Sequence, residues 1–285
     1  VLATSTTALP DIFRGRRRDG FTSHLFENDD PSRLDNDLAG TSTISQILDH
    51  FDLSNTETWH QTYFFNHAYV KDESKVNILY NPGEGAGKLS SITSASKSYV
   101  YYAQQLNADL YALEHRFYGT SQPTEDTFVE NLKFLSSRQA IEDIAEFIRQ
   151  INKNKAGEQK WIVVGGSYAG ALSAWVRLKH PELIAGALAS SAPILAQLDF
   201  YGYLQMVDAD FKTHGGLCYD HISAGIDAAQ KLLQSEEGRE TLTNLFKISP
   251  PLSAYDGLSS FDIDIFFSYL ISPFEYSAQY NKPTV

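Results

Sequence analysis

The sequence has little cysteine, few basic residues and no long apolar run. Its one cysteine, Cys218, excludes a disulfide within these 285 residues and a cysteine-rich zinc site. Lysine and arginine number 23 against 35 aspartates and glutamates, so the net charge of −12 disfavours nucleic acid as a partner. The longest uncharged stretches, 161–176 and 183–198, are shorter than the ~20 residues that a spanning helix needs. We therefore expect no membrane span.

The remaining composition is that of a globular protein. Hydrophobic residues make up 42% of the chain, aromatic residues 13% and charged residues 20%, which excludes the collagen-like and mostly disordered classes. A chain of this length is typical of one large α/β domain with an insertion. Residues 1–40 are polar and include the arginine-rich run 14–18, so we expect a flexible leader or propeptide remnant there.

From Ile44 onward, segments with strand-like and helix-like patterns alternate. Strands are predicted at 62–70, 76–80, 110–113, 161–164 and 183–189, and helices at 90–107, from Ser136 to near Gly157, and at 171–179. Ser136 and Gln139 have the capping-box spacing, and isoleucines follow at helical steps at 141, 144, 148 and 151. This order predicts right-handed crossovers and an α/β fold, with a mostly parallel sheet covered by helices on both faces.

The alternation of strand-like and helix-like segments ends after Pro193, and a helical region is expected beyond it. One amphipathic helix is predicted at 222–233, with a polar break at 235–238. The predicted organisation is a leader at 1–40, an α/β domain at 41–198 and a helical segment at 199–285.

One segment combines an apolar strand, a serine flanked by small residues, and a helix. Ser167 follows the strand 161–164 within Gly165-Gly166-Ser167-Tyr168-Ala169-Gly170, which is the context of a nucleophile elbow. The sharp turn requires small neighbours, and Ala169 departs from the strict Gly-x-Ser-x-Gly pattern by one methyl group. The alternative is an ordinary turn that binds phosphate at a helix amino end. Against it, no basic residue follows before Arg177, and no P-loop or Gly-x-Gly-x-x-Gly spacing is present.

A nucleophilic serine requires backbone donors for the developing oxyanion. Tyr168 N–H, directly after the serine, is the first candidate. The second is expected in the glycine-rich loop 81–87 after the strand 76–80, and we place it at Glu84. An ordinary turn is the alternative for this loop.

These residues resemble the lysosomal Pro-Xaa carboxypeptidase family, which also contains dipeptidyl peptidase II and many secreted fungal enzymes. The resemblance rests on motifs in order over about 45–220: 49–51 with 63–66, 80–85, 114–123, 165–181 and 186–193. One departure is Asn81-Pro82-Gly83, where the family more often has Gly-Asn before Glu-Gly, and it bears on the second oxyanion donor.

The resemblance implies an α/β-hydrolase domain with a helical cap inserted after the strand that follows the nucleophile. It also implies a serine exopeptidase that cleaves beside proline, secreted or held in a lysosome or vacuole. Cys218 stands where the family tends to have a disulfide cysteine, whose partner would lie beyond Val285.

The acid and base of a triad are not recognisable in the sequence. In this fold they follow the serine in the order Asp or Glu, then His, on loops after later strands. His180, His214 and His221 follow Ser167 but lie outside such loops, and His115 is better explained as part of a buried polar cluster. We therefore expect the triad Asp and His beyond residue 285, and low activity from residues 1–285 alone.

Three other functions stay open. A lipase or carboxylesterase shares the elbow, and the chain could instead be a non-catalytic binding fragment. A serine carboxypeptidase with a Gly-Glu-Ser-Tyr-Ala-Gly elbow is less favoured, because Gly166 replaces the glutamate that helps to bind the substrate's carboxylate. The expected partner is a peptide substrate, with a homodimer left open. We expect no cofactor, and no metal, since Asp262 and Asp264 have no His or Cys nearby.

Overall fold

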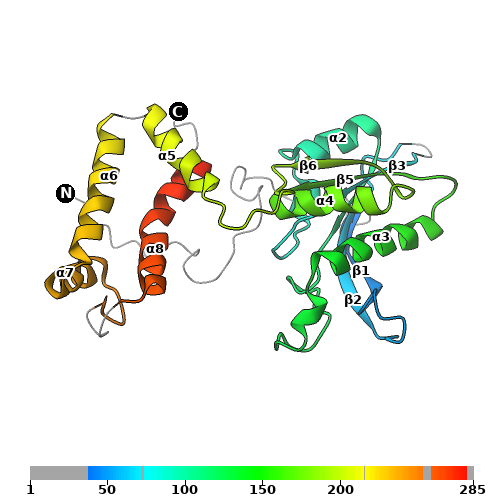
Figure 1. Ribbon diagram of the computed structural model, residues 1–285. Helices are drawn as coiled ribbons and strands as arrows, with labels where there is room; N and C mark the ends of the chain where they lie inside the picture. Colours follow the sequence, from blue (N-terminus) through cyan, green and yellow to red (C-terminus); the bar gives the residue numbers. More distant parts are fainter. Residues whose placement is uncertain (1–37, 72–73, 215, 253–257, 281–285) are drawn as a thin grey trace. The chain divides into compact units, whose positions relative to one another are not determined.

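The computed structural model describes residues 38–71, 74–214, 216–252 and 258–280 (Figure 1). The chain divides into two compact units between Ala196 and Gln197, two residues from the boundary expected from the sequence. The expected leader lies outside the described residues except for its end. There, Ala39 and Gly40 belong to a strand, which corrects the boundary at 40.

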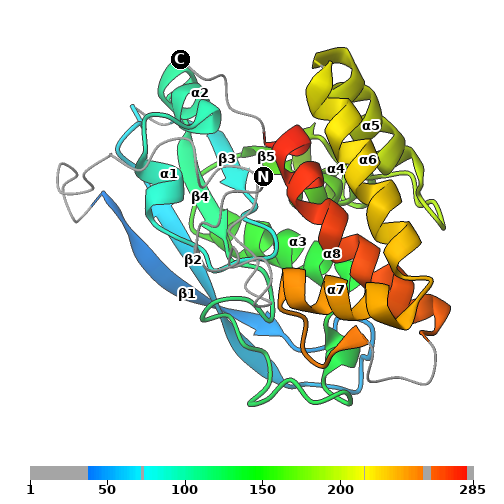
Figure 2. The same ribbon diagram turned by 90° about the vertical axis from the view of Figure 1, so that its left-hand side faces the viewer.

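The first unit contains a six-stranded sheet. Its strands are β1 (Ala39–Ile47), β2 (Thr58–Asn66), β3 (Val76–Tyr80), β4 (Asp109–Leu113), β5 (Lys160–Gly166) and β6 (Ile184–Ser190). The spatial order is β1-β2-β4-β3-β5-β6, in which β4, β3, β5 and β6 are parallel. β2 pairs antiparallel with both β1 and β4, and the long β1–β2 pair is visible in Figure 2.

Helices cover both faces of this sheet. α3 (Ser137–Lys153) and α4 (Ser167–Lys179) pack on one face around Phe147, Trp161 and Leu172. α1 (Ser90–Thr93) and α2 (Ser98–Leu106) cover the other face, with a core that includes Ile78, Ile92 and Val100. Neighbouring strand residues belong to different clusters, as the alternation of side chains along a strand requires. The predicted α/β class is therefore confirmed.

Several predicted elements differ from the observed ones in extent; α4, for example, begins at Ser167 and not at 171. β2 begins four residues before the predicted 62–70, because Trp59 and Gln61 are buried and extend the pairing with β1. The single helix predicted at 90–107 is divided, since Ser94 has an extended backbone and ends α1. α2 ends where Asn107 takes the left-handed conformation.

The predicted start of α3 is confirmed, although only half of the capping box forms. Ser136 Oγ accepts the backbone N–H of Gln139 at 3.3 Å. The Gln139 side chain does not return to Ser136: its Oε1 accepts from His50 N–H and its Nε2 donates to Asp49. Gln139 therefore ties α3 to the segment that follows β1.

The second unit is helical, as predicted. It contains α5 (Gly202–His214), α6 (Leu217–Leu232), α7 (Glu236–Phe246) and α8 (Ser260–Gln279), with a core around Leu233, Leu242 and Phe266. The break predicted at 235–238 is in fact the start of α7, where Ser235 Oγ accepts Gly238 N–H at 3.1 Å. Among the helices that the structure describes, none has both the length and the apolar character of a membrane span.

Candidate active site

Ser167 occupies a strained turn between β5 and α4. β5 ends at Gly166, and Ser167 is the first residue of α4, with a φ of +55°. A serine in this left-handed region costs on the order of 1–3 kcal/mol, and such strain clusters at functional sites. Ser167 is nevertheless exposed, at the carboxyl end of a strand that pairs with a parallel neighbour on each side. In open α/β sheets, ligands bind outside the carboxyl ends of the parallel strands.

Small residues on both sides of Ser167 allow β5 and α4 to approach closely. A Cβ atom at Gly165 would lie 2.2 Å from the carbonyl oxygen of Ala169, and one at Gly170 would lie 2.9 Å from that of Ser190. Ala169 itself is buried against Gly83, where a Cβ atom would be 3.3 Å from the Ala169 methyl. The extra methyl group at 169 is therefore accommodated because residue 83 has no side chain.

Gly165→Ala should disrupt the elbow. The new methyl group would meet backbone atoms, which cannot move aside as a flexible side chain could. Overpacking of this kind costs about 1–3 kcal/mol or more. We expect a lower urea midpoint and little activity, whereas Gly186→Ala, with open space around its Cβ position, should behave like wild type. Equal midpoints for the two variants would contradict the geometry of the turn.

The loop after β3 lies beside the first turn of α4. Asn81 N–H donates to Val164 O at 2.8 Å, and Asn81 Oδ1 accepts Gly83 N–H at 3.1 Å. Gly83 has a φ of +76°, a conformation that favours glycine, and it contacts Ala169. These contacts place the glycine-rich loop next to the residue that follows Tyr168.

A pocket of about 270 Å³ lies beside the β5–α4 turn. It is lined by residues of the loops after β3 and β4 and of the starts of α3 and α4: Glu84, His115, Tyr118, Leu135, Ser136, Ser137 and Tyr168. The structure thus brings together Tyr168 and Glu84, the two predicted oxyanion residues, at the elbow formed by Gly165, Gly166, Ala169 and Gly170.

His115 and Tyr168 form one wall of the pocket. Tyr168 OH donates to His115 Nε2 at 3.0 Å, and His115 Nδ1–H donates to Arg116 O at 2.7 Å; we assign the tautomer from these two partners. Burial lowers the pKa of His115, although the Arg116 carbonyl opposes the shift. Burial also raises the pKa of the Tyr168 hydroxyl. Both nitrogens of a neutral imidazole are engaged, which supports the structural role predicted for His115 over a general-base role.

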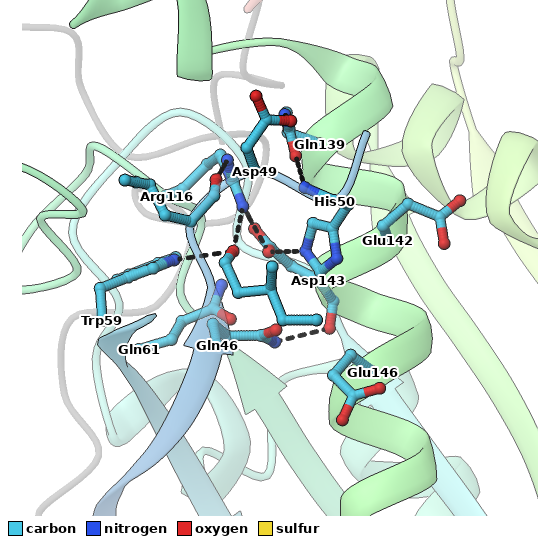
Figure 3. A network of polar contacts seen from close by, with 12 residues as sticks. Gln46, Asp49, His50, Trp59, Gln61, Arg116, Gln139, Glu142, Asp143 and Glu146 are labelled. Carbon is cyan, nitrogen blue, oxygen red and sulfur yellow. Dashed lines mark hydrogen bonds and ion pairs between the residues drawn. The ribbon is translucent and has the colours of Figure 1, made fainter. Parts of the chain in front are cut away.

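A buried ionic network surrounds Arg116, the residue after His115 in the sequence (Figure 3). Arg116 is fully buried, and its Nε and Nη2 donate to Asp143 at 2.7 and 2.6 Å. Its remaining donors reach the carbonyl oxygens of Leu48, Phe134 and Ile47. His50 Nε2 lies 2.8 Å from Asp143 Oδ1, the oxygen that also accepts from Arg116 Nη2. This network joins β4, α3 and the segment after β1.

None of the histidines that follow Ser167 is placed as its base by the structure. His180 lies at the opposite end of α4, about 20 Å from Ser167 at 1.5 Å per residue, and contacts Glu142 at 3.0 Å. His214 and His221 belong to helices of the second unit. No cluster of three or more His, Cys, Asp or Glu suited to a metal is present in the described ranges. Asp262 instead caps α8 through Ser259, and Cys218 is an exposed free thiol.

Several residues of this region were not predicted from the sequence. Ser136, Ser137 and Leu135 line the pocket, although Ser136 was noticed only as a helix cap. Asp143 was also missed. The sequence feature that could have indicated Asp143 is a polar pair at helical spacing, Gln139 and Asp143, beside the apolar face of α3.

Comparison with known proteins gives relatives that are all longer than this chain. A Caenorhabditis elegans protein is 36% identical over 238 residues, covering 83% of this chain and 44% of its own length. The human lysosomal Pro-X carboxypeptidase is 33% identical over 221 residues, covering 75% of this chain and 44% of its own length. The mouse thymus-specific serine protease is 37% identical over 166 residues, covering 58% of this chain and 32% of its own length. The chain thus spans about half the length of the curated relatives that it matches, or less.

Solved structures that resemble the chain have low overall similarity. An arylesterase matches with a TM-score of 0.38 and 11% identity, covering 59% of this chain and 50% of that chain. An esterase of Pyrococcus furiosus matches with a TM-score of 0.37 and 14% identity, covering 60% and 55%.

The family assignment rests on a family model. The model described as serine carboxypeptidase S28 matches residues 46–285, which is most of the chain. This match confirms the resemblance noted in the sequence, and it agrees with a mostly parallel sheet that carries a serine at the β5–α4 turn. The strand order of the first unit, with a serine at the β5–α4 turn, agrees with the α/β-hydrolase fold that the resemblance implied. The chain belongs to the serine carboxypeptidase S28 family.

Proposed function

We propose that this chain carries the nucleophile of a serine exopeptidase, and that the nucleophile is Ser167. One observation carries the proposal: an exposed serine with a φ of +55° stands between the carboxyl end of the parallel strand β5 and the start of a helix. The geometry presents the hydroxyl to solvent while the turn keeps it fixed. Membership of a peptidase family supports this role.

The oxyanion of the tetrahedral intermediate would be bound by Tyr168 N–H and Glu84 N–H. Tyr168 follows the nucleophile, as the first donor does in such folds. In the loop after β3, Asn81 N–H bonds to Val164, Pro82 has no N–H, and Gly83 N–H bonds to Asn81. Glu84 is the next residue along this loop and lines the same pocket as Tyr168. Its place in the loop and in the lining of this pocket supports its N–H as the second donor.

The reaction would proceed through an acyl-enzyme. Ser167 Oγ attacks the carbonyl carbon of the peptide bond while a histidine takes its proton, and the same histidine gives that proton to the amine as the C–N bond breaks. Water then attacks the ester and releases the acid. We propose that this histidine and its aspartate partner come from the part of the whole protein outside residues 1–285, in the order Ser, Asp, His.

The proposed substrates are peptides with proline next to the scissile bond. Support comes from the ordered motifs, and from a relative named lysosomal Pro-X carboxypeptidase. We also propose a secreted, lysosomal or vacuolar location, on the same resemblance.

A peptide panel tests the substrate class. The full-length protein should hydrolyse peptides with penultimate proline at least tenfold faster, in kcat/KM, than the same peptides with alanine. One series carries a free carboxyl end and the other a free amino end, so that carboxypeptidase and dipeptidyl-peptidase action are separated. Turnover of p-nitrophenyl esters with none of the peptides would instead support a carboxylesterase.

A further inference from the structure

Glu114 is a buried carboxylate directly after β4, beside the proposed oxyanion loop. It is 2% exposed and begins the segment that carries His115 and Tyr118 into the pocket. Its backbone is fixed on both sides, since its N–H donates to Thr62 O at 3.0 Å and its carbonyl oxygen accepts from Gln61 Nε2 at 2.7 Å. None of the steps proposed above uses its side chain.

The two carboxylate oxygens bind different loops. Oε1 accepts the backbone N–H of Gly87, in the loop after β3, at 2.8 Å. Oε2 accepts from the turn after β4: from Thr120 N–H and Thr120 Oγ1, both at 3.0 Å, and from Ser121 Oγ at 2.7 Å. The four donors match the number of lone-pair positions of a carboxylate, about four, although three of them share Oε2.

The chain leaves room for this carboxylate. Gly119 has a φ of +55°, and a Cβ atom there would lie 1.9 Å from Glu114 Oε1. Any side chain at 119 would displace the carboxylate. The turn therefore has space for the Glu114 carboxylate only because residue 119 has no side chain.

We propose that Glu114 is a positioning residue for the oxyanion hole: its carboxylate fixes the loop after β3 through Gly87 N–H and so holds Glu84 N–H beside Tyr168 N–H. This inference rests on the proposed function of Ser167. The loop 81–87 is anchored at its start by Asn81 and at its end by Glu114, so Glu84 lies between two fixed points. Donors to an oxyanion act by being fixed before the charge develops.

Glu114→Gln tests this role with a small change in structure. Glutamine has nearly the same shape as glutamate, but its terminal NH₂ group donates and does not accept. Backbone N–H donors face both oxygen positions, Gly87 on one side and Thr120 on the other. With its NH₂ group toward Gly87, the amide releases the loop after β3 directly. With its NH₂ group toward Thr120, it opposes the backbone donor of the turn after β4, so the oxygen that accepts from Gly87 N–H is held less firmly.

The experiment uses the full-length protein with Glu114→Gln. Active sites are counted by end-point labelling with a fluorophosphonate, so that unfolded molecules do not enter the rates. We expect kcat per site on a prolyl peptide to fall about 10- to 100-fold, as for a misplaced oxyanion donor, while KM changes less than about threefold. The rate constant of fluorophosphonate labelling should fall by a similar factor.

Two control variants separate positioning from stability. Glu125→Gln makes the same chemical change at an exposed site after β4 and should retain wild-type rates. Ile148→Val removes a methyl group from the buried face of α3, so it should lower thermal stability while kcat per titrated site is unchanged. If Glu114→Gln behaves like Ile148→Val, Glu114 is purely structural and the inference is overturned.

The outcomes also separate this inference from the proposed function. Absence of labelling at Ser167 in the wild-type protein would refute the function itself. Labelling of Ser167 at equal rates in wild type and Glu114→Gln would refute only the positioning role. If Glu114→Gln does not fold, Thr120→Val decides: it removes one donor to Oε2 at an exposed position and should lower kcat about two- to fourfold. An unchanged kcat would overturn the inference.

Discussion

Ser167→Ala should lower kcat of the full-length protein by about 10⁶, equivalent to about 8 kcal/mol of transition-state stabilisation. The large effect is expected because alanine has no group that can form the acyl-enzyme. Only the contribution of the oxyanion hole and of substrate binding would remain, about 10³–10⁴ over the uncatalysed reaction. KM or the affinity for a competitive product should change little, because the substitution removes one oxygen atom from an exposed position.

Ser173→Ala is the matched control. Ser173 lies on the same helix two turns later, is fully buried, and donates to Ala169 O at 2.8 Å. Its loss should affect stability by about 1 kcal/mol and leave kcat within a few-fold of wild type. Steady-state hydrolysis of a prolyl peptide measures both variants. Residual kcat above about 1% in Ser167→Ala would exclude Ser167 as the nucleophile.

Asp143→Ala should produce the largest loss of stability. It leaves the Arg116 guanidinium fully buried with no counter-ion, and removing one partner of a buried pair costs about 3–5 kcal/mol. A domain has only about 5–15 kcal/mol in total. We expect a sharp fall in the urea midpoint and a low soluble yield.

Glu146→Ala provides the comparison on the same helix. Its carboxylate is partly exposed and lies 3.8 Å from Arg149, so its loss should cost less than about 1 kcal/mol. Similar urea midpoints for the two variants would contradict the structural role of the network.

The same network predicts a pH dependence of stability. Burial alone would raise the pKa of Asp143, but hydrogen bonds and charge from Arg116, with help from His50, lower it overall. Because the folded-state pKa lies below the unfolded value of about 3.9, the stabilisation is present above pH 4 and is lost as the pH falls through the folded-state value.

The sequence predicted the elbow because that feature is local. Strand, turn and helix are contiguous from 160 to 179, and the requirement for small residues at 165, 169 and 170 can be recognised without knowing the rest of the fold. The start of α3 was predictable for the same reason, since Ser136 caps the helix within one turn.

Contacts between distant segments could not be predicted in this way. Arg116 meets Asp143 27 residues later, and His50 meets Asp143 across 93 residues. β1 was missed because its sequence, AGTSTISQI, has few apolar residues, and pairing along β2 rather than burial holds it in the sheet. The full role of Gln139 likewise depends on residues near 50, which the capping pattern does not include.

Mapping the site of a fluorophosphonate adduct tests the central claim most directly. Trypsin should release residues 161–177 as one peptide, which contains only two serines, Ser167 and Ser173. Fragmentation of the labelled full-length protein should place the adduct on Ser167. The pocket beside the elbow is lined by two other serines, Ser136 and Ser137. An adduct on either of these, or on any serine other than Ser167, would contradict the assignment of the nucleophile.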